Sequence, residues 1–396
     1  MSPVTGIPPQ SSRILVVDDA ELNRDLLSRR LSRDGHSVDV AVNGREALDL
    51  LAREPFDVVL LDINMPVMDG YETLERLKAD SALQHIPVIM ITAVSEDESI
   101  VRCLTLGAED HLPKPFNPMI LRARVNASLA RKRLHDREQL YAESMARELE
   151  IGRRIQAGFF PDVLPQPAGW DLAAHFASAR EVAGDFYDAF ALPGDRVALV
   201  VGDVCDKGVG AALFMALFRS LFRAIAEQRF SAECDPSDAL HSTLAATNDY
   251  IARTHGNANM FATVFFAVLD ARAGSLRYIN AGHEAPTILR PGGDVRMRLV
   301  RTGPAVGMFP DAPFDVAHAS LHPGETLFAF TDGVIDMRNG SGSEFSEPHL
   351  LELLNSPTSS ASALLTRVQN ALVAHAAGEP AFDDVTMLAL RCEAAA

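Results

Sequence analysis

Several aspartates in the N-terminal third of the chain directly follow apolar runs. Asp18 and Asp19 come after Ile14–Val17, and Asp62 comes after Phe56–Leu61. Carboxylates that folding brings together repel one another and raise one another's pKa unless a cation lies between them. Mg²⁺ is the expected cation, because it is a hard ion that prefers oxygen ligands and retains water. These residues therefore predict a magnesium site.

The elements that must position these aspartates are short strands separated by single helices. Apolar runs alternate with amphipathic segments over the first third of the chain, which predicts βαβ units around a parallel sheet. Right-handed crossovers place the carboxyl ends of all strands at one edge. The three aspartates should therefore meet Thr92, which ends the fourth run, and Lys114, which follows the fifth. A metal-neutralised Asp62 could attack a phosphoryl donor there, while Thr92 and Lys114 bind the new phosphate oxygens.

The segments that carry this chemistry resemble the receiver domain of bacterial two-component response regulators. The resemblance rests on LVVDDAELNR, VVLLDINMPVMDGYE, VIMITA and HLPKPFNP and covers about residues 13–125. It implies an α/β fold with a five-stranded parallel sheet of the flavodoxin-like kind, Asp62 as phosphoacceptor, and a cognate histidine kinase as partner. The alternative is a structural acidic edge on an ordinary α/β domain.

The same resemblance implies the ligands of one Mg²⁺ beside Asp62. Asp19 would bind the ion directly and Asp18 would bind it through water. The backbone carbonyl of Asn64 would complete the set of protein ligands.

The resemblance also implies a switch that responds to phosphorylation. Thr92 and Lys114 belong to it, and the residue after the lysine, Pro115, resembles a proline that the family has in the cis form. Three residues before the lysine the family often has Tyr or Phe, whereas this chain has His111. An imidazole could still move inward, so the departure affects only the detail of signal transmission.

A long, highly charged segment over residues 118–156 follows the receiver-like part. Its apolar positions Leu134, Tyr141, Met145 and Leu149 fall at spacings of seven, four and four, which predicts one long helix with a single apolar stripe. The stripe favours a short coiled coil and a homodimer, because a lone exposed stripe stabilises a helix poorly. The alternative is a solvated spacer helix.

After Trp170 the pattern changes to one of strands that follow each other directly. The run Phe261–Leu269 leads into Leu276–Ile279 through Ala273 and Gly274, which predicts a hairpin. Longer helical segments are interspersed with such strands. The pattern indicates an α+β domain in which an antiparallel sheet core carries helices outside.

This second domain also has aspartates at strand ends. Asp185, Asp203 and Asp332 each adjoin a glycine, and Asp383 and Asp384 precede the last apolar run. A centre of carboxylates without Cys or His selects Mg²⁺ or Mn²⁺ over zinc. Two such ions roughly 3.5–4 Å apart could bind a phosphate oxygen and a bridging water for in-line attack on phosphorus, without a covalent enzyme intermediate.

These segments resemble the PPM family of metal-dependent serine/threonine phosphatases, in its SpoIIE-type branch. The resemblance covers about residues 147–392 and rests on segments that include REVAGDFYDAF, VVGDVCDKGVGAALFMAL, LFAFTDGVIDMRN and AFDDVTMLAL. It implies a β-sandwich flanked by helices, with the metals at one end. It also implies a substrate of the kind the branch dephosphorylates, namely phosphoserine on an anti-anti-sigma-factor-like protein.

The ligands of the two metals are likewise implied by the resemblance. Asp185, Asp203 and the Val204 carbonyl would bind the first ion. Asp203 would bridge to the second ion, which Asp332 and Asp383 would complete. Asp384 is the neighbouring candidate if the register differs by one residue.

Four further residues near these motifs have two interpretations each. The branch commonly has GDVSGHG where this chain has Cys205, Asp206 and Lys207, and Lys207 is either an aid to phosphate binding or a loop charge. Cys205 is better explained as a small packing residue than as a nucleophile. His283 is a proton donor or, more commonly for such a residue, a turn histidine held by its neighbours. Arg180 is a phosphate clamp or a solvated rim residue.

Composition excludes several other classes of protein. The chain has 396 residues and a net charge of −17, which argues against general affinity for nucleic acid or anionic membrane. No apolar run looks long enough to span a bilayer, and the first ten residues lack the features of a signal peptide. The four cysteines are scattered without CxxC spacing, which favours reduced thiols in a cytoplasm.

The sequence thus predicts three parts, a receiver domain at 13–125, a helical linker at 126–160 and a phosphatase domain at 161–392. The predicted function is a cytoplasmic response regulator whose output domain hydrolyses phosphoserine or phosphothreonine on a partner protein. One alternative is a phosphorylation-controlled adaptor with an inactive phosphatase-like domain. A transcriptional regulator is remote, because there is no helix-turn-helix with a basic face.

Overall fold

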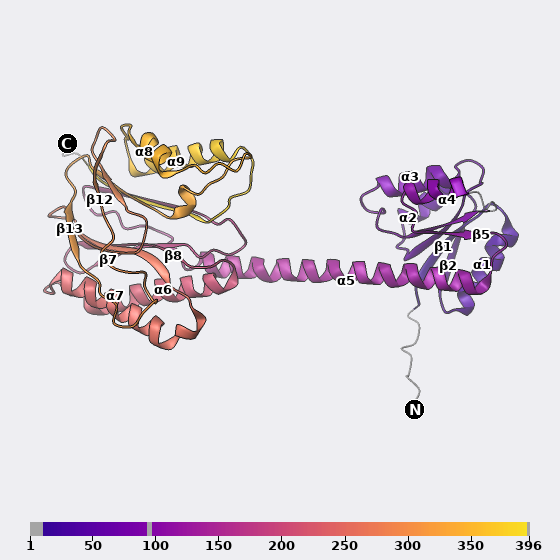
Figure 1. Cartoon of the computed structure of the whole chain (residues 1–396), viewed down its shortest axis with the longest axis horizontal. Helices are drawn as coiled ribbons and strands as arrows, with labels where there is room; N and C mark the ends of the chain where they lie inside the picture. Colours follow the sequence, from indigo (N-terminus) through magenta and orange to yellow (C-terminus); the bar gives the residue numbers. More distant parts are fainter. Residues whose placement is uncertain (1–10, 93–96, 394–396) are drawn as a thin grey trace, which may run out of the picture. The chain divides into compact units, whose positions relative to one another are not determined.

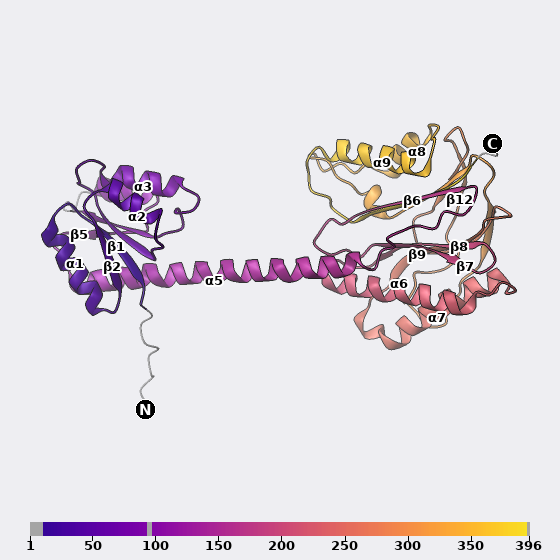
Figure 2. The ribbon, with the colours of Figure 1, turned by 180° about the vertical axis from the view of Figure 1, so that it is seen from behind.

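The computed structural model of this chain describes residues 11–92 and 97–393 (Figures 1 and 2). The chain divides into two compact units, Met1–Met145 and Ala146–Ala396. The expectation that no signal peptide is present concerns residues 1–10, which lie outside the described residues.

The first unit is a parallel sheet with helices on both faces. Its strand order is β2-β1-β3-β4-β5, from β1 (Arg13–Val17), β2 (Ser37–Ala41), β3 (Val58–Asp62), β4 (Val88–Thr92) and β5 (Asp110–Pro113). The helices are α1 (Glu21–Arg33), α2 (Gly44–Leu51), α3 (Gly70–Ala79), α4 (Asp97–Thr105) and α5 (Pro118–Ala157).

Alternate residues of these strands point to opposite faces of the sheet, as they must in a pleated strand. Val16 packs with Leu27 of α1 and Val125 of α5 on one face. Leu15 packs with residues such as Leu74 of α3 on the other face. The five-stranded α/β fold expected from the sequence is confirmed, and helices cover both faces of the sheet.

Helix α5 is 40 residues long and covers the segment for which one helix was predicted. Its first turns carry Leu121, Val125 and Leu129, which are buried in the first unit. Further along, Tyr141 and Met145 are exposed to 63% and 59%. The helix is therefore confirmed, and its apolar stripe is exposed at these two positions and half-buried at Leu149.

The second unit contains two antiparallel sheets. One has the order β13-β10-β9-β8-β7, from β7 (Phe186–Leu192), β8 (Arg196–Val204), β9 (Ala262–Asp270), β10 (Ser275–Ala281) and β13 (Ala317–Ser320). The other has the order β12-β11-β14-β15-β6, from β6 (Trp170–Ala177), β11 (Thr287–Leu289), β12 (Val295–Arg298), β14 (Thr326–Phe330) and β15 (Val385–Cys392). The predicted hairpin is present, with Leu276 opposite Leu269.

The two sheets pack face to face and carry helices on their outer faces. Leu199, Phe265 and Leu388 belong to the core between the sheets. In Figure 1 and from behind in Figure 2, α6 (Val209–Arg229) and α7 (Pro236–Thr254) cover one sheet, while α8 (Glu347–Leu354) and α9 (Ala361–Ala376) cover the other. The β-sandwich flanked by helices is thus confirmed.

Helix α6 corrects one expectation from the sequence. It has 21 residues and, by length and composition alone, is apolar enough to cross a membrane, so the statement that no apolar run is long enough is wrong. In the folded chain Met215, Phe218 and Phe222 of this helix pack into the core beneath the first sheet. Its hydrophobicity is therefore that of a helix covering a sheet.

Candidate functional site

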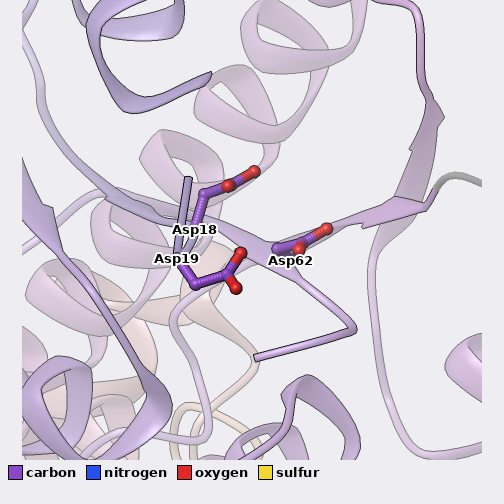
Figure 3. Close-up of side chains that lie close together, drawn as sticks. All are labelled: Asp18, Asp19 and Asp62. Atoms are coloured by element: carbon purple, nitrogen blue, oxygen red, sulfur yellow. The ribbon is translucent and has the colours of Figure 1, made fainter. Parts of the chain in front are cut away.

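The three predicted aspartates of the first unit meet at the carboxyl edge of its sheet (Figure 3). Carboxylate oxygens of Asp18, Asp19 and Asp62 all lie within 4.8 Å of one another. Asp18 and Asp62 are buried, and Asp19 is exposed. Among residues 11–92 and 97–393 this is the one such group of three, and its oxygens suit a hard cation such as Mg²⁺.

Lys114 lies against two of these carboxylates. Its Nζ is 2.9 Å from Asp18 Oδ2 and 2.8 Å from Asp62 Oδ1. Burial lowers the pKa of Lys114, but the hydrogen bonds with Asp62 and Asp18 raise it overall. Burial also raises the pKa of Asp62, against the opposing effect of Lys114. The lysine is therefore charged and partly neutralises the cluster.

Local hydrogen bonds hold the loop that carries Asp18. The Asn23 side chain donates to both carboxylate oxygens of Asp18, over 3.1 and 3.0 Å. Arg24 donates to the backbone carbonyls of Asp18 and Asp19. A Cβ on Gly70 would lie 2.2 Å from the Asp62 carbonyl, so only glycine lets the start of α3 approach the end of β3 so closely.

The remaining predicted receiver residues lie around the same edge. Thr92 is buried at the end of β4 and accepts the Lys114 N–H on its backbone carbonyl over 2.7 Å. The Lys114–Pro115 bond is cis, as expected. Asn64 is exposed in the loop after β3, and His111 is half-buried in β5, with Nδ1 3.8 Å from Asp110.

The second acidic site lies where the two sheets of the other unit meet at one end. Asp185 immediately precedes β7, and Asp203 lies near the end of β8. Asp332 begins the short 3-10 helix η2 (Asp332–Val334) after β14, and Asp383 stands two residues before β15. The structure therefore gathers aspartates from both sheets of the sandwich.

Asp185 is buried and is held by two threonines that the sequence reasoning missed. Its Oδ2 accepts hydrogen bonds from Thr331 Oγ1 over 2.6 Å and from Thr386 Oγ1 over 2.7 Å. Burial and the Asp203 carboxylate raise the pKa of Asp185 well above its ordinary value. Each threonine stands near an acidic motif, in FTDG and DDVT, which is the signal that could have pointed to it.

The aspartates of this cluster repel one another, so a bound cation would stabilise their charged forms. Burial, followed by the carboxylates of Asp332 and Asp383, raises the pKa of Asp203 to about 7. Burial and Asp383 raise the pKa of Asp332 to about 6. These carboxylates interact, but among the described residues of this unit no three aspartates meet the 4.8 Å spacing of the first site. A wider set of hard oxygen ligands fits divalent cations that retain water ligands.

Asp383 and Asp384 are adjacent but have different surroundings. The Asp384 carboxylate is buried and accepts backbone N–H groups of Ala179 over 2.8 Å and Gly184 over 2.9 Å. Asp383 is half-buried and lies 2.6 Å from Lys207 Nζ. Asp384 is therefore occupied in holding the loop before Asp185, whereas Asp383 is accessible from the outer side of the cluster.

Glycines allow the acidic segments to come this close. A Cβ on Gly333 would lie 1.9 Å from the Asp384 carbonyl, so η2 can touch the segment before β15 only without a side chain there. A Cβ on Gly184 would lie 3.0 Å from the Val204 carbonyl, and the Val204 N–H donates to the Gly184 carbonyl. The Val204 backbone therefore adjoins the loop that carries Asp185.

Two of the four residues with open interpretations, His283 and Cys205, are packing residues in the structure. His283 is buried, its Nδ1 is 2.9 Å from Thr263 Oγ1, and burial lowers its pKa to about 3. Such a histidine is neutral at pH 7, which disfavours it as a proton donor. Burial raises the pKa of the Cys205 thiol, and its sulfur accepts the Phe261 N–H, which disfavours it as a nucleophile.

The end of α5 contacts the loop before Asp185, a link that the sequence reasoning did not resolve. Gln156 is buried, and its side chain donates to the Ala183 carbonyl over 2.8 Å and accepts the Ala183 N–H over 3.0 Å. Phe160 packs on Tyr187 of β7. The last turn of α5 and the residues after it therefore belong to the surroundings of Asp185.

Two family models match this chain. One, described as a response regulator receiver domain, matches residues 14–126. The other, described as Stage II sporulation protein E (SpoIIE), matches residues 193–393, about half of the chain. Both resemblances drawn from the sequence are confirmed by these matches.

Similar proteins are known for each unit. Protein IcfG from Synechocystis is 43% identical over 261 residues, which are 61% of this chain and 41% of that protein. Response regulator PleD from Caulobacter vibrioides is 40% identical over 141 residues, which are 36% of this chain and 31% of that protein. The chain thus spans less than half the length of either relative.

One solved structure shares the fold of the second unit. The SiaA-PP2C domain of Pseudomonas aeruginosa aligns with a TM-score of 0.52 at 22% identity, over 63% of this chain and 98% of that domain. At this level of identity the likeness concerns the fold alone.

Proposed function

The chain belongs to the SpoIIE family, and on that premise we propose that it is a metal-dependent protein serine/threonine phosphatase controlled by a receiver domain. We assign residues 13–125 to the receiver, 126–160 to a helical linker and 161–392 to the phosphatase domain. The observation that carries the proposal is the group formed by the buried Asp185, the half-buried Asp203, Asp332 and Asp383, with a raised pKa at three of the four.

We propose that the aspartates of the second unit bind two Mn²⁺ or Mg²⁺ ions. Asp185, Asp203 and the Val204 carbonyl would bind one, and Asp203, Asp332 and Asp383 the other. Asp384 is the weaker candidate, because its carboxylate already accepts two backbone N–H groups. When bound, such ions lower the pKa of a bridging water and neutralise charge on a phosphoryl group.

The chain's own residues would orient this chemistry. Thr331 and Thr386 both donate to Oδ2 of Asp185 and would thereby fix the orientation of its carboxylate. Burial keeps bulk water from competing for the carboxylates, which strengthens their interaction with a cation.

The direct test is release of phosphate from a generic aryl phosphate with Mn²⁺ present. We expect turnover in the wild-type chain and its loss in Asp203→Asn, because Asp203 is shared by both metal positions. Asp238→Asn, an exposed residue of α7, is the matched control and should retain full turnover. Wild-type turnover that survives in Asp203→Asn would contradict the proposed site.

We propose that Asp62 is the phosphoacceptor and that a cognate histidine kinase phosphorylates it. Asp19 would bind Mg²⁺ directly, Asp18 through water, and the Asn64 carbonyl would complete the ligands. Thr92, His111 and Lys114 would then respond to the roughly two negative charges that the phosphoryl group adds. Formation of an alkali-labile, hydroxylamine-sensitive phosphoprotein from acetyl phosphate, absent in Asp62→Asn, is the measurement.

We further propose that α5 carries the signal to the phosphatase site. Gln156 supports this route, because its side chain holds Ala183, two residues before Asp185. Beryllofluoride, which mimics the phosphoryl group, should change turnover in the wild-type chain but not in Gln156→Ala. An equal response of both proteins would remove Gln156 from the route.

The exposed stripe of α5 supports a homodimer formed through this helix. Leu134, Tyr141 and Met145 are all more than half exposed in the single chain. Light scattering of the wild-type chain and of Leu134→Glu tests this, and a wild-type monomer with and without beryllofluoride would contradict it.

The proposed substrate is phosphoserine or phosphothreonine on a partner protein of the anti-anti-sigma-factor type, which follows from the family resemblance. The competing function is an adaptor that binds such a protein without hydrolysing it. Binding of a phosphorylated partner with no phosphate release at saturating Mn²⁺ would favour the adaptor.

A further inference from the structure

An open groove of about 730 Å³ lies beside Asp383 in the second unit. Three cationic side chains, Arg180, Lys207 and Arg338, line it together with one acidic side chain, Glu379. The charged lining residues therefore sum to 3 − 1 = +2, in a chain whose net charge is −17. Asp383 contacts Lys207 and Glu344 contacts Arg338, so these cations are partly compensated, but the groove is still less acidic than the chain as a whole. An anionic ligand is therefore favoured in the groove over most of the remaining surface.

An aromatic ring holds two of these cations in place. Lys207 Nζ lies 4.4 Å and Arg338 Cζ 4.1 Å from the centroid of Phe382, which is 47% exposed. Lys207 also donates to the Phe382 carbonyl over 3.0 Å. Two like charges on one ring repel each other, so an anion that binds between or beside them is favoured.

The loop that presents Arg338 is held in one conformation. Arg338 pairs with Glu344 across an isolated bridge, with 3.2 Å between Nη2 and Oε1. Inside the loop, the Asn339 side chain accepts the N–H groups of Ser341 and Ser343 over 3.0 and 3.1 Å. The guanidinium is therefore presented by a preformed turn, which reduces the entropy lost when a ligand binds.

The groove is continuous with the acidic cluster through one residue. Lys207 contacts Asp383 over 2.6 Å and lines the groove at the same time. A peptide segment with its phosphorylated residue at the aspartates would reach the groove by passing its neighbouring residues over Lys207 and Phe382 towards Arg338.

We propose that this groove binds acidic side chains that flank the phosphorylated residue of the protein substrate. The inference rests on the proposed phosphatase function, which places the phosphoryl group at the aspartates. The planar guanidinium of Arg338 can donate two parallel hydrogen bonds to a carboxylate, and Lys207 supplies a point charge closer to the cluster. Phe382 adds apolar contact for the segment between them. The groove would therefore favour protein substrates that have acidic residues beside the phosphorylated residue.

The chemistry favours a peptide over a nucleic acid as the occupant. The net charge of −17 repels a polyphosphate backbone, which needs many phosphate contacts to bind. A short acidic segment needs only the two cations on Phe382.

The test compares two phosphoserine peptides of equal length, one with Asp and Glu beside the phosphoserine and one with Asn and Gln. We expect the wild-type chain with Mn²⁺ to hydrolyse the acidic peptide with a kcat/KM about tenfold higher, as charge-assisted hydrogen bonds of this kind allow. In Arg338→Gln the preference should fall to within about twofold, and Lys207→Gln should lower it as well.

Arg272→Gln is the matched control, because this exposed arginine lies in the β9–β10 hairpin, at the end of β9 remote from Asp203. Arg272→Gln should retain the wild-type preference for the acidic peptide. Added salt should reduce this preference in the wild-type chain and in Arg272→Gln alike. Equal kcat/KM for the two peptides in the wild-type chain would overturn the groove proposal. A preference that survives in Arg338→Gln and Lys207→Gln would also overturn it.

The failure of the groove and the failure of the phosphatase function give different results. Turnover of the aryl phosphate that depends on Asp203, without preference between the peptides, leaves the phosphatase standing and removes the groove. If no phosphate is released from any compound, fluorescence anisotropy of the labelled peptides measures binding directly. Tighter binding of the acidic peptide, lost in Arg338→Gln, then supports the groove, and equal binding overturns it.

Discussion

The two acidic sites of this chain differ in how their negative charge is balanced. In the receiver, Lys114 contacts both buried carboxylates, Asp18 and Asp62, from within the same sheet edge. In the phosphatase domain, Asp185 is buried and Asp203 half-buried, and within the described part of the chain no lysine or arginine forms an ion pair with either, whereas Lys207 contacts the outer Asp383. The second site should therefore depend far more strongly on added divalent cations.

The two sites also differ in how the fold assembles them. The receiver aspartates follow strands of one parallel sheet, so a single rule about strand ends brings them together. The phosphatase aspartates come from both sheets of a sandwich, with Asp203 on β8 and Asp383 before β15. Their geometry therefore requires the two sheets to pack correctly, and damage to the interface between the sheets should affect this site first.

The largest expected effect comes from replacing one aspartate in each site and measuring both activities in each variant. Asp203→Asn should lower phosphatase kcat by about 10³-fold, a magnitude typical of removing a group that stabilises charge directly in the reaction. It should leave phosphorylation of Asp62 by acetyl phosphate unchanged. Asp62→Asn should abolish that phosphorylation and retain unstimulated turnover. Loss of both activities in either variant would show that the sites are not separable.

A smaller effect is expected from the hydroxyls that hold Asp185. Thr386→Val removes one of the two hydrogen bonds to Oδ2 and should raise the Mn²⁺ concentration for half-maximal turnover about tenfold, as for other residues that orient a metal ligand. Thr366→Val, on an exposed face of α9, is the matched control. The two Mn²⁺ titrations measure the difference, and superimposable curves would contradict the orienting role.

The uncompensated carboxylates should also make stability depend on pH. The pKa of Asp203 is about 7 in the folded chain and about 3.9 when unfolded, so the folded state holds more protons between these values. Its stability should therefore fall as pH rises from about 4 to about 7. Melting temperatures in EDTA should show this fall, with a shallower slope in Asp203→Asn. Mn²⁺ should reverse it, and identical slopes in both proteins would be the contrary result.

The smallest expected effect concerns Lys114, the positively charged side chain of the receiver site. Lys114→Met leaves Asp18 and Asp62 unpaired and should lower the melting temperature of the receiver by a few degrees, about the shift expected for 1 kcal/mol. Mg²⁺ should then stabilise this variant more than the wild-type chain. Equal Mg²⁺-induced shifts would mean that Lys114 does not balance the cluster. Lys78→Met, a lysine that donates to backbone carbonyls of Gln84 and Ile86, is the comparison.

The meeting of the receiver aspartates and Lys114 at one edge of the sheet was predictable from the sequence. Asp18, Asp62 and Thr92 stand directly at the ends of apolar runs, and a parallel sheet places all such ends together whatever the order of its strands. Even the cis peptide before Pro115 agreed with the resemblance. Local sequence and one topological rule were sufficient here.

In the second unit, the sequence predicted which aspartates come together but not the hydrogen bonds that hold them. The difference between Asp383 and Asp384 depends on backbone N–H groups of Ala179 and Gly184, about 200 residues away in the chain. The bonds of Asp185 with Thr331 and Thr386 span similar separations. No pattern of spacing encodes such contacts, because they arise only when two sheets pack.

Two arginines of α6 limit the insertions and deletions that this helix can tolerate. Arg219 and Arg223 lie one helical turn apart, and both contact the buried Asp188 of β7, over 3.1 and 2.9 Å. They fix the rotation and the axial position of α6, whose first residue, Val209, closely follows the segment from Asp203 to Lys207. An insertion or deletion of a single residue inside α6 would move either the arginines or that segment. Length changes should therefore be tolerated far less in this helix than in the exposed middle of α5.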